Sequence, residues 1–127
     1  MTKIKVVFHS CTQDSQELGS DEHMVSRLFL SIIVEGKSTD NLHVDIKQTV
    51  GADYASGPLE VGNVTGYRGP FNHAEFQRAA ESYYREMVGA SGRMIRVVGG
   101  GGVRMRNNTF MVEKSFEFEG SETAGGW

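Results

Sequence analysis

Polar and apolar residues alternate at the start of the chain. Between residues 3 and 9 the apolar side chains Ile4, Val6 and Phe8 are separated mainly by charged or polar ones. An alternation with a period of two is typical of a β-strand that buries one face. The segment therefore predicts a first strand with a half-buried pattern.

The next apolar segment covers residues 24 to 34 and is apolar on both parities, since Phe29 and Ile33 fall on the parity opposite to Leu30. This pattern favours a central strand that is covered on both faces. Residues 42 to 46 alternate again, and residues 35 to 41 between the two segments are polar and turn-forming. We therefore expect a hairpin of two strands with a long loop.

One amphipathic helix is well indicated, at about residues 72–88. Asn72 is a suitable N-cap, and Glu75 stands three residues later, as in a capping box. Phe71 and Phe76 flank this start with the spacing of a hydrophobic staple. These signals agree on where the helix begins.

The apolar residues of this helix fall on one face, as expected for a helix that lies on a sheet. They are Phe76, Ala80, Tyr83, Tyr84 and Met87. The aromatic stripe could serve as a ligand platform, but we prefer a core face, because the only helix of a domain has to bury its apolar side. Gly89 marks the expected C-terminal end.

The remaining strand signals are weaker. Glycines interrupt every run between residues 51 and 69, so we expect one short strand there, at about residues 59–64. Residues 110–119 predict a long strand with apolar residues on one parity, interrupted by Lys114, and glutamates on the other. Asn107 and Asn108 then form either a two-residue turn or a bulge before it.

Four consecutive glycines, residues 99–102, separate two short alternating segments that carry four arginines and no acid. A phosphate-binding loop would need a helix start after the glycines, but the next residues alternate like a strand. We therefore expect a β-hairpin over residues 93–106, with Val97 opposite Val103 and Arg96 opposite Arg104.

In that register Arg96, Arg104 and Arg106 share one face. Like charges that oppose each other destabilise a sheet unless an acid or an anion is near. One interpretation is a structural ladder of arginines with the glutamates of residues 113–119. The other is a site for a phosphate, a carboxylate or an acidic protein segment.

Candidates for catalysis are few: His9, Cys11 and His73. A cysteine nucleophile needs a base within hydrogen-bonding distance, whereas a cysteine at a strand end is more often a small buried residue. The four histidines show no metal-ligand spacing, so we expect neither a metal nor a cofactor. An enzyme would use a cleft between the helix and residues 51–69.

Length and charge narrow the function further. The 127 residues fit one domain, over residues 1–119, followed by a glycine-rich flexible tail, residues 120–127, that ends in Trp127. Trp127 could instead dock on its own domain or on a second subunit. The 13 basic and 16 acidic residues give a net charge of −3, which argues against a nucleic-acid partner. No apolar run suits a signal peptide or a membrane span, so we expect a cytoplasmic protein without a membrane partner.

The expected fold is α+β, with a mostly antiparallel sheet of about six strands and one helix. The alternative is a β-sandwich with the helix in a crossover. The second apolar face of residues 24–34 favours a homodimer. The expected function is a non-catalytic binding or assembly domain that recognises an anionic ligand or an acidic protein through its arginine hairpin, and the alternative is a small-molecule enzyme.

Overall fold

A computed structural model describes residues 2–18, 21–50, 55–90 and 108–123. The predicted arginine hairpin of residues 93–106, including Arg96, Arg104 and Arg106, lies outside these ranges, as does Trp127. The elements, in chain order, are β1 (Thr2–Leu18), β2 (Asp21–Val34), β3 (Lys37–Val50), β4 (Ala55–Val61), β5 (Pro70–Phe71), α1 (His73–Ala90), β6 (Asn108–Phe110), β7 (Lys114–Gly120) and β8 (Glu122–Thr123).

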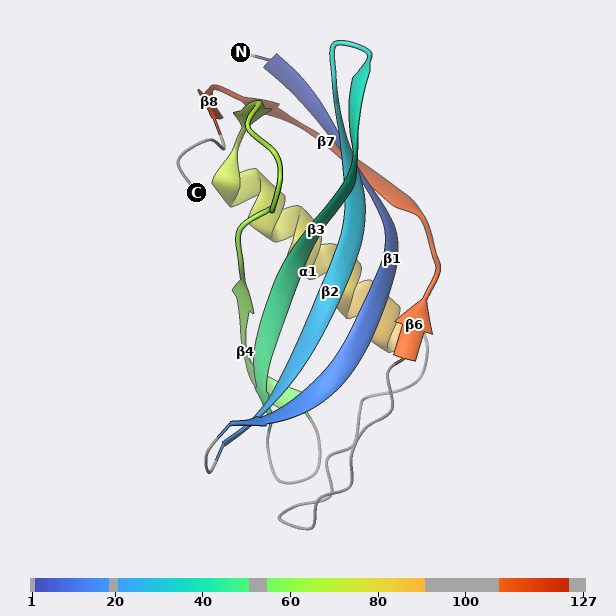
Figure 1. Cartoon of the computed structure of the whole chain (residues 1–127), viewed down its shortest axis with the longest axis vertical. Coiled ribbons are helices and arrows are strands. Elements are labelled where there is room, and N and C mark those ends of the chain that lie inside the picture. The colour runs from blue at the N-terminus through green and yellow to red at the C-terminus, as the bar shows by residue number, and fades with distance from the viewer. Residues whose placement is uncertain (1, 19–20, 51–54, 91–107, 124–127) are drawn as a thin grey trace.

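The main sheet is antiparallel and has the order β4-β3-β2-β1, with β6 and β7 both pairing with the remaining edge of β1. The strands are long and curved, and α1 crosses one face of the sheet (Figure 1). β5 and β8 form a separate two-stranded sheet. The predicted α+β class, a mostly antiparallel sheet with one helix, is confirmed.

The hairpin of β2 and β3 has a tight turn, so the expectation of a long loop is wrong. Only Glu35 and Gly36 lie between the strands, and both have a positive φ, of 51° and 78°. Two central residues with positive φ match the twist of the flanking strands. Residues 37 to 41, which the polar composition assigns to the loop, belong to β3.

Two register shifts interrupt the long ladders at neighbouring positions. In β1, Phe8 pairs with Leu30 and Ser10 pairs with Phe29, so His9 is an extra residue between them. A second shift lies in β3, where Leu42 pairs with Leu30 and Thr39 pairs with Ile32. Two residues of β3, Asp40 and Asn41, therefore lie opposite the single residue Ser31. Such bulges bend a strand and exchange the two faces beyond them. After the first bulge it is Cys11, not Thr12, that is fully buried.

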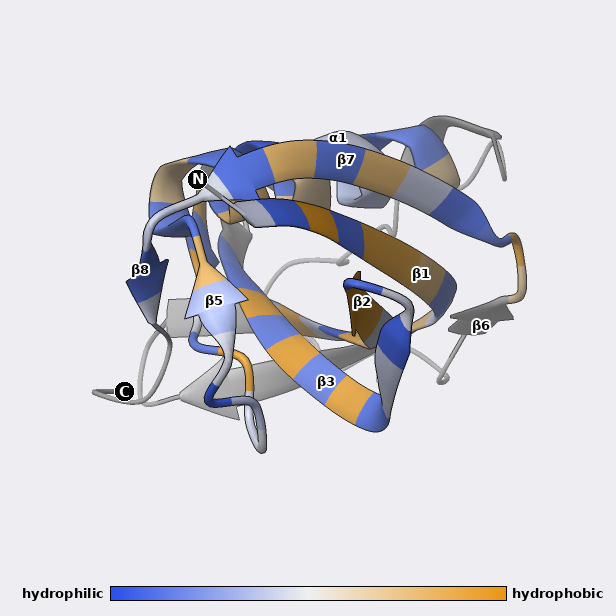
Figure 2. Cartoon of the chain, turned by 90° about the horizontal axis from the view of Figure 1, so that it is seen from above, coloured by the Kyte–Doolittle hydropathy of each residue, from blue (hydrophilic) through white to orange (hydrophobic). Residues whose placement is uncertain are grey.

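The core lies between α1 and one face of the sheet. Alternate residues of each strand form this face, and the alternation of apolar and polar residues is visible along β3 (Figure 2). Phe8 is fully buried at its centre. Its ring stacks on Tyr83 at 4.9 Å between centroids and contacts the rings of Phe76 and Phe116 at 6.1 and 5.7 Å. Aromatic pairs of this kind add about 0.5–1.5 kcal/mol each to the burial of their surface.

The start of the helix follows the sequence prediction closely. Asn72 Oδ1 accepts a 3.1 Å hydrogen bond from the backbone N–H of Glu75, and the rings of Phe71 and Phe76 lie 5.0 Å apart. The predicted cap and staple are therefore confirmed, while the Glu75 carboxylate pairs with Arg78. The helix ends at Ala90, one residue beyond Gly89. All five residues of its predicted core face are buried.

The outer face of the sheet differs from the prediction. Phe29, on the outer face of β2, is 39% exposed, so β2 is not covered on both faces by the residues that the structure describes. The reason is that the described part of the chain contains one helix, and the sheet curls around it. The outer apolar side chains are instead flanked by cross-strand polar neighbours such as Ser10 and His43.

The last part of the chain departs from the prediction in two places. The expected single strand of residues 110–119 is divided into β6 and β7 by residues 111–113, where Met111 and Val112 are 78% and 50% exposed. Residues 120–123, assigned by composition to a flexible tail, are structured, because Gly120 is buried and β8 pairs with β5. Backbone pairing and a close contact thus outweigh the polar composition.

Gly120 supplies a stability test. A Cβ at this position would overlap the backbone carbonyl of Phe71 and the Cδ1 atom of Ile4. We expect Gly120→Ala to lower the free energy of unfolding by about 1–3 kcal/mol, as overpacking does in a filled site. Chemical denaturation measures this effect, with the exposed Ser121→Ala as the matched control. Equal stability of the two variants would show that Phe71 does not pack on Gly120.

Candidate functional site

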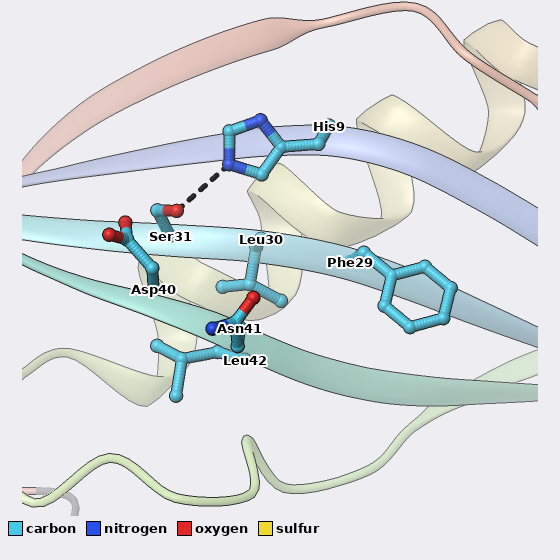
Figure 3. Close-up of a pocket in the computed structure, with 7 residues that line it drawn as sticks. All are labelled: His9, Phe29, Leu30, Ser31, Asp40, Asn41 and Leu42. Carbon is cyan, nitrogen blue, oxygen red and sulfur yellow. Dashed lines mark hydrogen bonds between the residues drawn. The ribbon is translucent and has the colours of Figure 1, made fainter.

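The two bulges bring polar side chains from three neighbouring strands to one level of the outer face. His9 is the extra residue of β1, Ser31 faces it from β2, and Asp40 lies in the shifted part of β3. Figure 3 shows the three side chains on adjacent strands, with His9 directed toward Ser31. Bulges recur next to functional sites because they redirect side chains in this way.

Hydrogen bonds link His9 to Ser31 and to Glu113, and a separate one links Asp40 to Ser38. The Nε2 atom of His9 lies 2.8 Å from Ser31 Oγ, and its Nδ1 atom lies 3.1 Å from the Glu113 carboxylate. Ser38 Oγ donates a 2.7 Å hydrogen bond to Asp40 Oδ1. Hydrogen bonds from Ser38 and then Ser31 lower the pKa of Asp40, and the nearby His9 acts in the same direction. The Asp40 carboxylate is therefore kept ionised.

A hollow of about 410 Å³ opens beside this network. His9, Ser31 and Asp40 contribute its polar wall, and Phe29 contributes an aromatic one (Figure 3). Volumes of this size suit a small ligand or a single side chain of a partner. Asn41, which also lines the hollow, has a φ of 60°, a conformation that asparagine tolerates better than most residues.

The chain of Glu113, His9 and Ser31 has the order of an acid, a base and a nucleophile. However, the Asp40 carboxylate lines the same hollow as Ser31 and is kept ionised. A negative charge beside a serine opposes the oxyanion that forms when the hydroxyl attacks an acyl group. The network is suited to holding charge in place and not to activating a nucleophile.

Cys11, the most distinctive catalytic candidate of the sequence, lies on the opposite face of the sheet. Its side chain is fully buried in the core, and desolvation raises the pKa of its thiol to about 12, although the adjacent Ser26 hydroxyl acts in the opposite direction. Burial likewise raises the pKa of Tyr83 to about 12. The interpretation of Cys11 as a small buried residue is supported.

His73 stands at the start of α1, where its backbone N–H and its ring both contact the Glu122 carboxylate. The structure thus assigns His9 to the outer face, Cys11 to the core and His73 to a helix terminus, and the three do not share a site. Val64 and Tyr67, which belong to residues 62–69, are buried in the core. The predicted cleft includes residues 51–54, which lie outside the described ranges, so it stays a prediction.

The glutamates that the ladder hypothesis offered to the arginine hairpin have other partners. Glu113 contacts His9, and Glu117 lies 3.9 Å from the ammonium of Lys3. Lys3 and Lys5 of β1 lie opposite Glu119 and Glu117 of β7. The charge ladder of this face therefore involves lysines, while the proposed role of the arginines stays a prediction.

The sequence did not point to Ser31 or Asp40 as site residues, and it offered Glu113 only as a partner for the arginines. Ser31, Asp40 and Glu113 are separated from His9 by 22, 31 and 104 positions, and two of them become neighbours of His9 only through the bulges. Within the ranges that the structure describes, no three metal-ligating side chains lie together, and α1 is not apolar enough to cross a membrane. No family model, curated protein or solved structure was found that matches the chain.

The state of Cys11 can be tested with a thiol reagent. At pH 8 we expect iodoacetamide to leave Cys11 of the native protein unmodified, because the thiol is buried and its pKa is about 12. The same treatment in guanidinium chloride should modify it completely, and mass spectrometry measures both. Modification of the native protein at a rate near that of the unfolded chain would contradict the buried position.

Proposed function

We propose that this protein is a non-catalytic binding domain that accepts a cationic group, an ammonium or a guanidinium, in the hollow beside His9, Ser31 and Asp40. The observation that carries the proposal is the Asp40 carboxylate, which is exposed, kept ionised mainly by the hydrogen bond from Ser38, and part of a hollow that the exposed Phe29 also lines. The ligand is a small molecule or a peptide side chain that bears such a group.

The charge of Asp40 is available to a ligand, in contrast to that of its neighbour Asp45. Arg27 binds Asp45 through two hydrogen bonds of 2.8 and 3.1 Å. Among the described residues, no lysine or arginine forms a salt bridge with Asp40, whose bonds come from hydroxyl groups. A cation in the hollow would complete the pair.

The wider function expected from the sequence stays part of this proposal. A binding or assembly role is retained, as are a homodimer and a cytoplasmic location. Recognition of an anion by Arg96, Arg104 and Arg106 remains a prediction that concerns a second surface, and it does not conflict with a cation site on the sheet.

A second candidate function is acyl transfer with Ser31 as the nucleophile. The geometry of Glu113, His9 and Ser31 favours it, since both contacts lie within the distance that proton transfer requires. The negative charge of Asp40, in the same hollow, opposes it, because this charge would destabilise an oxyanion formed at Ser31. Binding is therefore the preferred function.

The cation site can be tested with single-charge probes. We expect N-acetyl-lysine amide to shift the backbone amide signals of residues 29–31 and 40–42 in two-dimensional NMR, whereas N-acetyl-glutamine amide leaves them unchanged. Asp40→Asn should weaken binding about three- to tenfold, since an exposed charge pair contributes up to about 1 kcal/mol and its hydrogen bonds add to this.

The matched control is Asp45→Asn, which changes the same residue type on the same strand at a carboxylate that Arg27 already occupies. This variant should bind the lysine probe as tightly as the parent protein. Equal losses in both variants, or equal shifts with the glutamine probe, would overturn the proposal, because binding would then not depend on the charge of Asp40.

The two functions differ in the reactivity of Ser31. A fluorophosphonate, which reacts covalently with activated serines, should leave the protein unlabelled at neutral pH, because the Asp40 carboxylate opposes the negative charge that develops in the attack by Ser31. Intact-mass measurement reads the result. Labelling of the parent protein that Ser31→Ala abolishes would establish acyl transfer in place of simple binding.

A further inference from the structure

The edge strand β7 has an opening on its outer side. Among the strands that the structure describes, β7 pairs only with β1, so its second row of backbone N–H and C=O groups has no strand partner. Unpaired edges are templates for a further strand, and proteins usually cover them or place charges on them. β7 carries charged side chains and parts of its edge are covered, but an uncovered stretch is left between the covered parts.

A side chain at the start of α1 and one within it cover the two ends of the open edge of β7. Asn72 Nδ2 donates a 2.9 Å hydrogen bond to the carbonyl of Glu119, and the Tyr83 hydroxyl donates a 2.6 Å hydrogen bond to the carbonyl of Val112, just before β7. Because alternate residues of a strand direct their backbone groups to the same side, Ser115 and Glu117 carry the open groups between these two caps.

A groove of about 240 Å³ runs beside this opening, between β7 and α1. Its apolar floor comes from Phe116 and Phe118, which are only partly buried, and from Ala79 of the helix. Its polar rim consists of Ser82, Glu117 and the paired side chains of Glu75 and Arg78. A strand added to β7 would direct every second side chain over this floor and the others toward the outer face.

The charges on β7 select the kind of strand that fits. Glu117 and Glu119 are exposed on the outer face, on either side of Phe118. In most registers a second copy of β7 would bring glutamate against glutamate, which destabilises a sheet. Basic side chains in the same outer positions would be attracted. We propose that the edge of β7 binds a short extended peptide in which apolar and basic residues alternate.

This site is separate from the hollow at Asp40, and it uses backbone hydrogen bonds that the hollow lacks. A two-residue opening supports only a short ladder, so we expect a weak and reversible interaction, in the high micromolar to millimolar range typical of small contacts. Its specificity would come from the alternation of the peptide and from its charge.

The test uses the full chain and two acetylated hexapeptides, one of alternating valine and lysine and one of alternating valine and glutamate. NMR titration of the parent protein should shift the amide signals of Ser115 and Glu117 with the lysine peptide and not with the glutamate peptide. A lysine peptide with a central proline, which lacks an N–H donor, should bind more weakly.

Two variants locate the site. Glu117→Lys should weaken the binding of the lysine peptide about threefold or more and strengthen the binding of the glutamate peptide, because the cross-strand charge is reversed. Ser82→Arg, at an exposed helix position on the groove rim, should obstruct both. The control is Glu60→Lys on the exposed side of β4, at the other edge of the sheet, which should bind like the parent.

The proposal is overturned if the shifts map away from β7, if both peptides bind alike, or if Glu117→Lys and Ser82→Arg leave the affinity unchanged. It is also overturned if the protein dimerises through β7 in the absence of peptide, since a second copy would then be the occupant. Asp40→Asn should not alter the peptide titration, which separates a failure of this site from a failure of the cation site.

Discussion

The bulge that follows Phe8 is the constraint on which the arrangement of the two sheet faces depends. Up to Phe8, even-numbered residues of β1 point into the core, and beyond the bulge the odd-numbered Cys11 does so. Phe8 is thereby fixed among Tyr83, Phe76 and Phe116, so the bulge and the helix position each other. A one-residue slip of β1 would expose Phe8 and bury charged residues, at a cost of several kcal/mol.

The same bulge determines what the outer face presents. His9 is not part of the regular ladder, and its ring can therefore reach across β1 to Ser31 on one side and to Glu113 on the other. The second bulge, in β3, brings Asp40 to the same level. Both shifts border the same stretch of β2, and residues of that stretch line the hollow. The bulge after Phe8 thus affects both the core contact and the candidate site.

The sequence predicts local structure well and cross-strand structure poorly, for physical reasons that particular residues illustrate. Asn72, Phe71 and Phe76 predict the start of the helix because a cap and a staple involve residues within five positions. The tight turn at Glu35 and Gly36 was missed because a glutamate with positive φ carries no strong signal. The prediction that β2 is covered on both faces was wrong, because apolar residues on both parities do not reveal how many layers the fold contains.

The candidate site was less predictable still. His9 was singled out from its position at a strand end, but Ser31 and Asp40 are ordinary polar residues until the register is known. A bulge adds one residue to a ladder, and in a sequence that addition looks the same as a change of parity or the end of a strand. The apolar pattern of residues 4 to 8 even suggests a strand that stops at His9, whereas β1 continues to Leu18.

Charge pairing across the strands explains why binding, and not stability, is the natural role of Asp40. The net charge of −3 is small, and on the outer face Arg27 pairs with Asp45 while the ammonium of Lys3 lies 3.9 Å from Glu117. Asp40 departs from this pattern, since serine hydroxyls hold it in its ionised form without neutralising it. Hydroxyl donors orient a carboxylate but leave its charge, so the free energy of pairing is still available to a cation from outside.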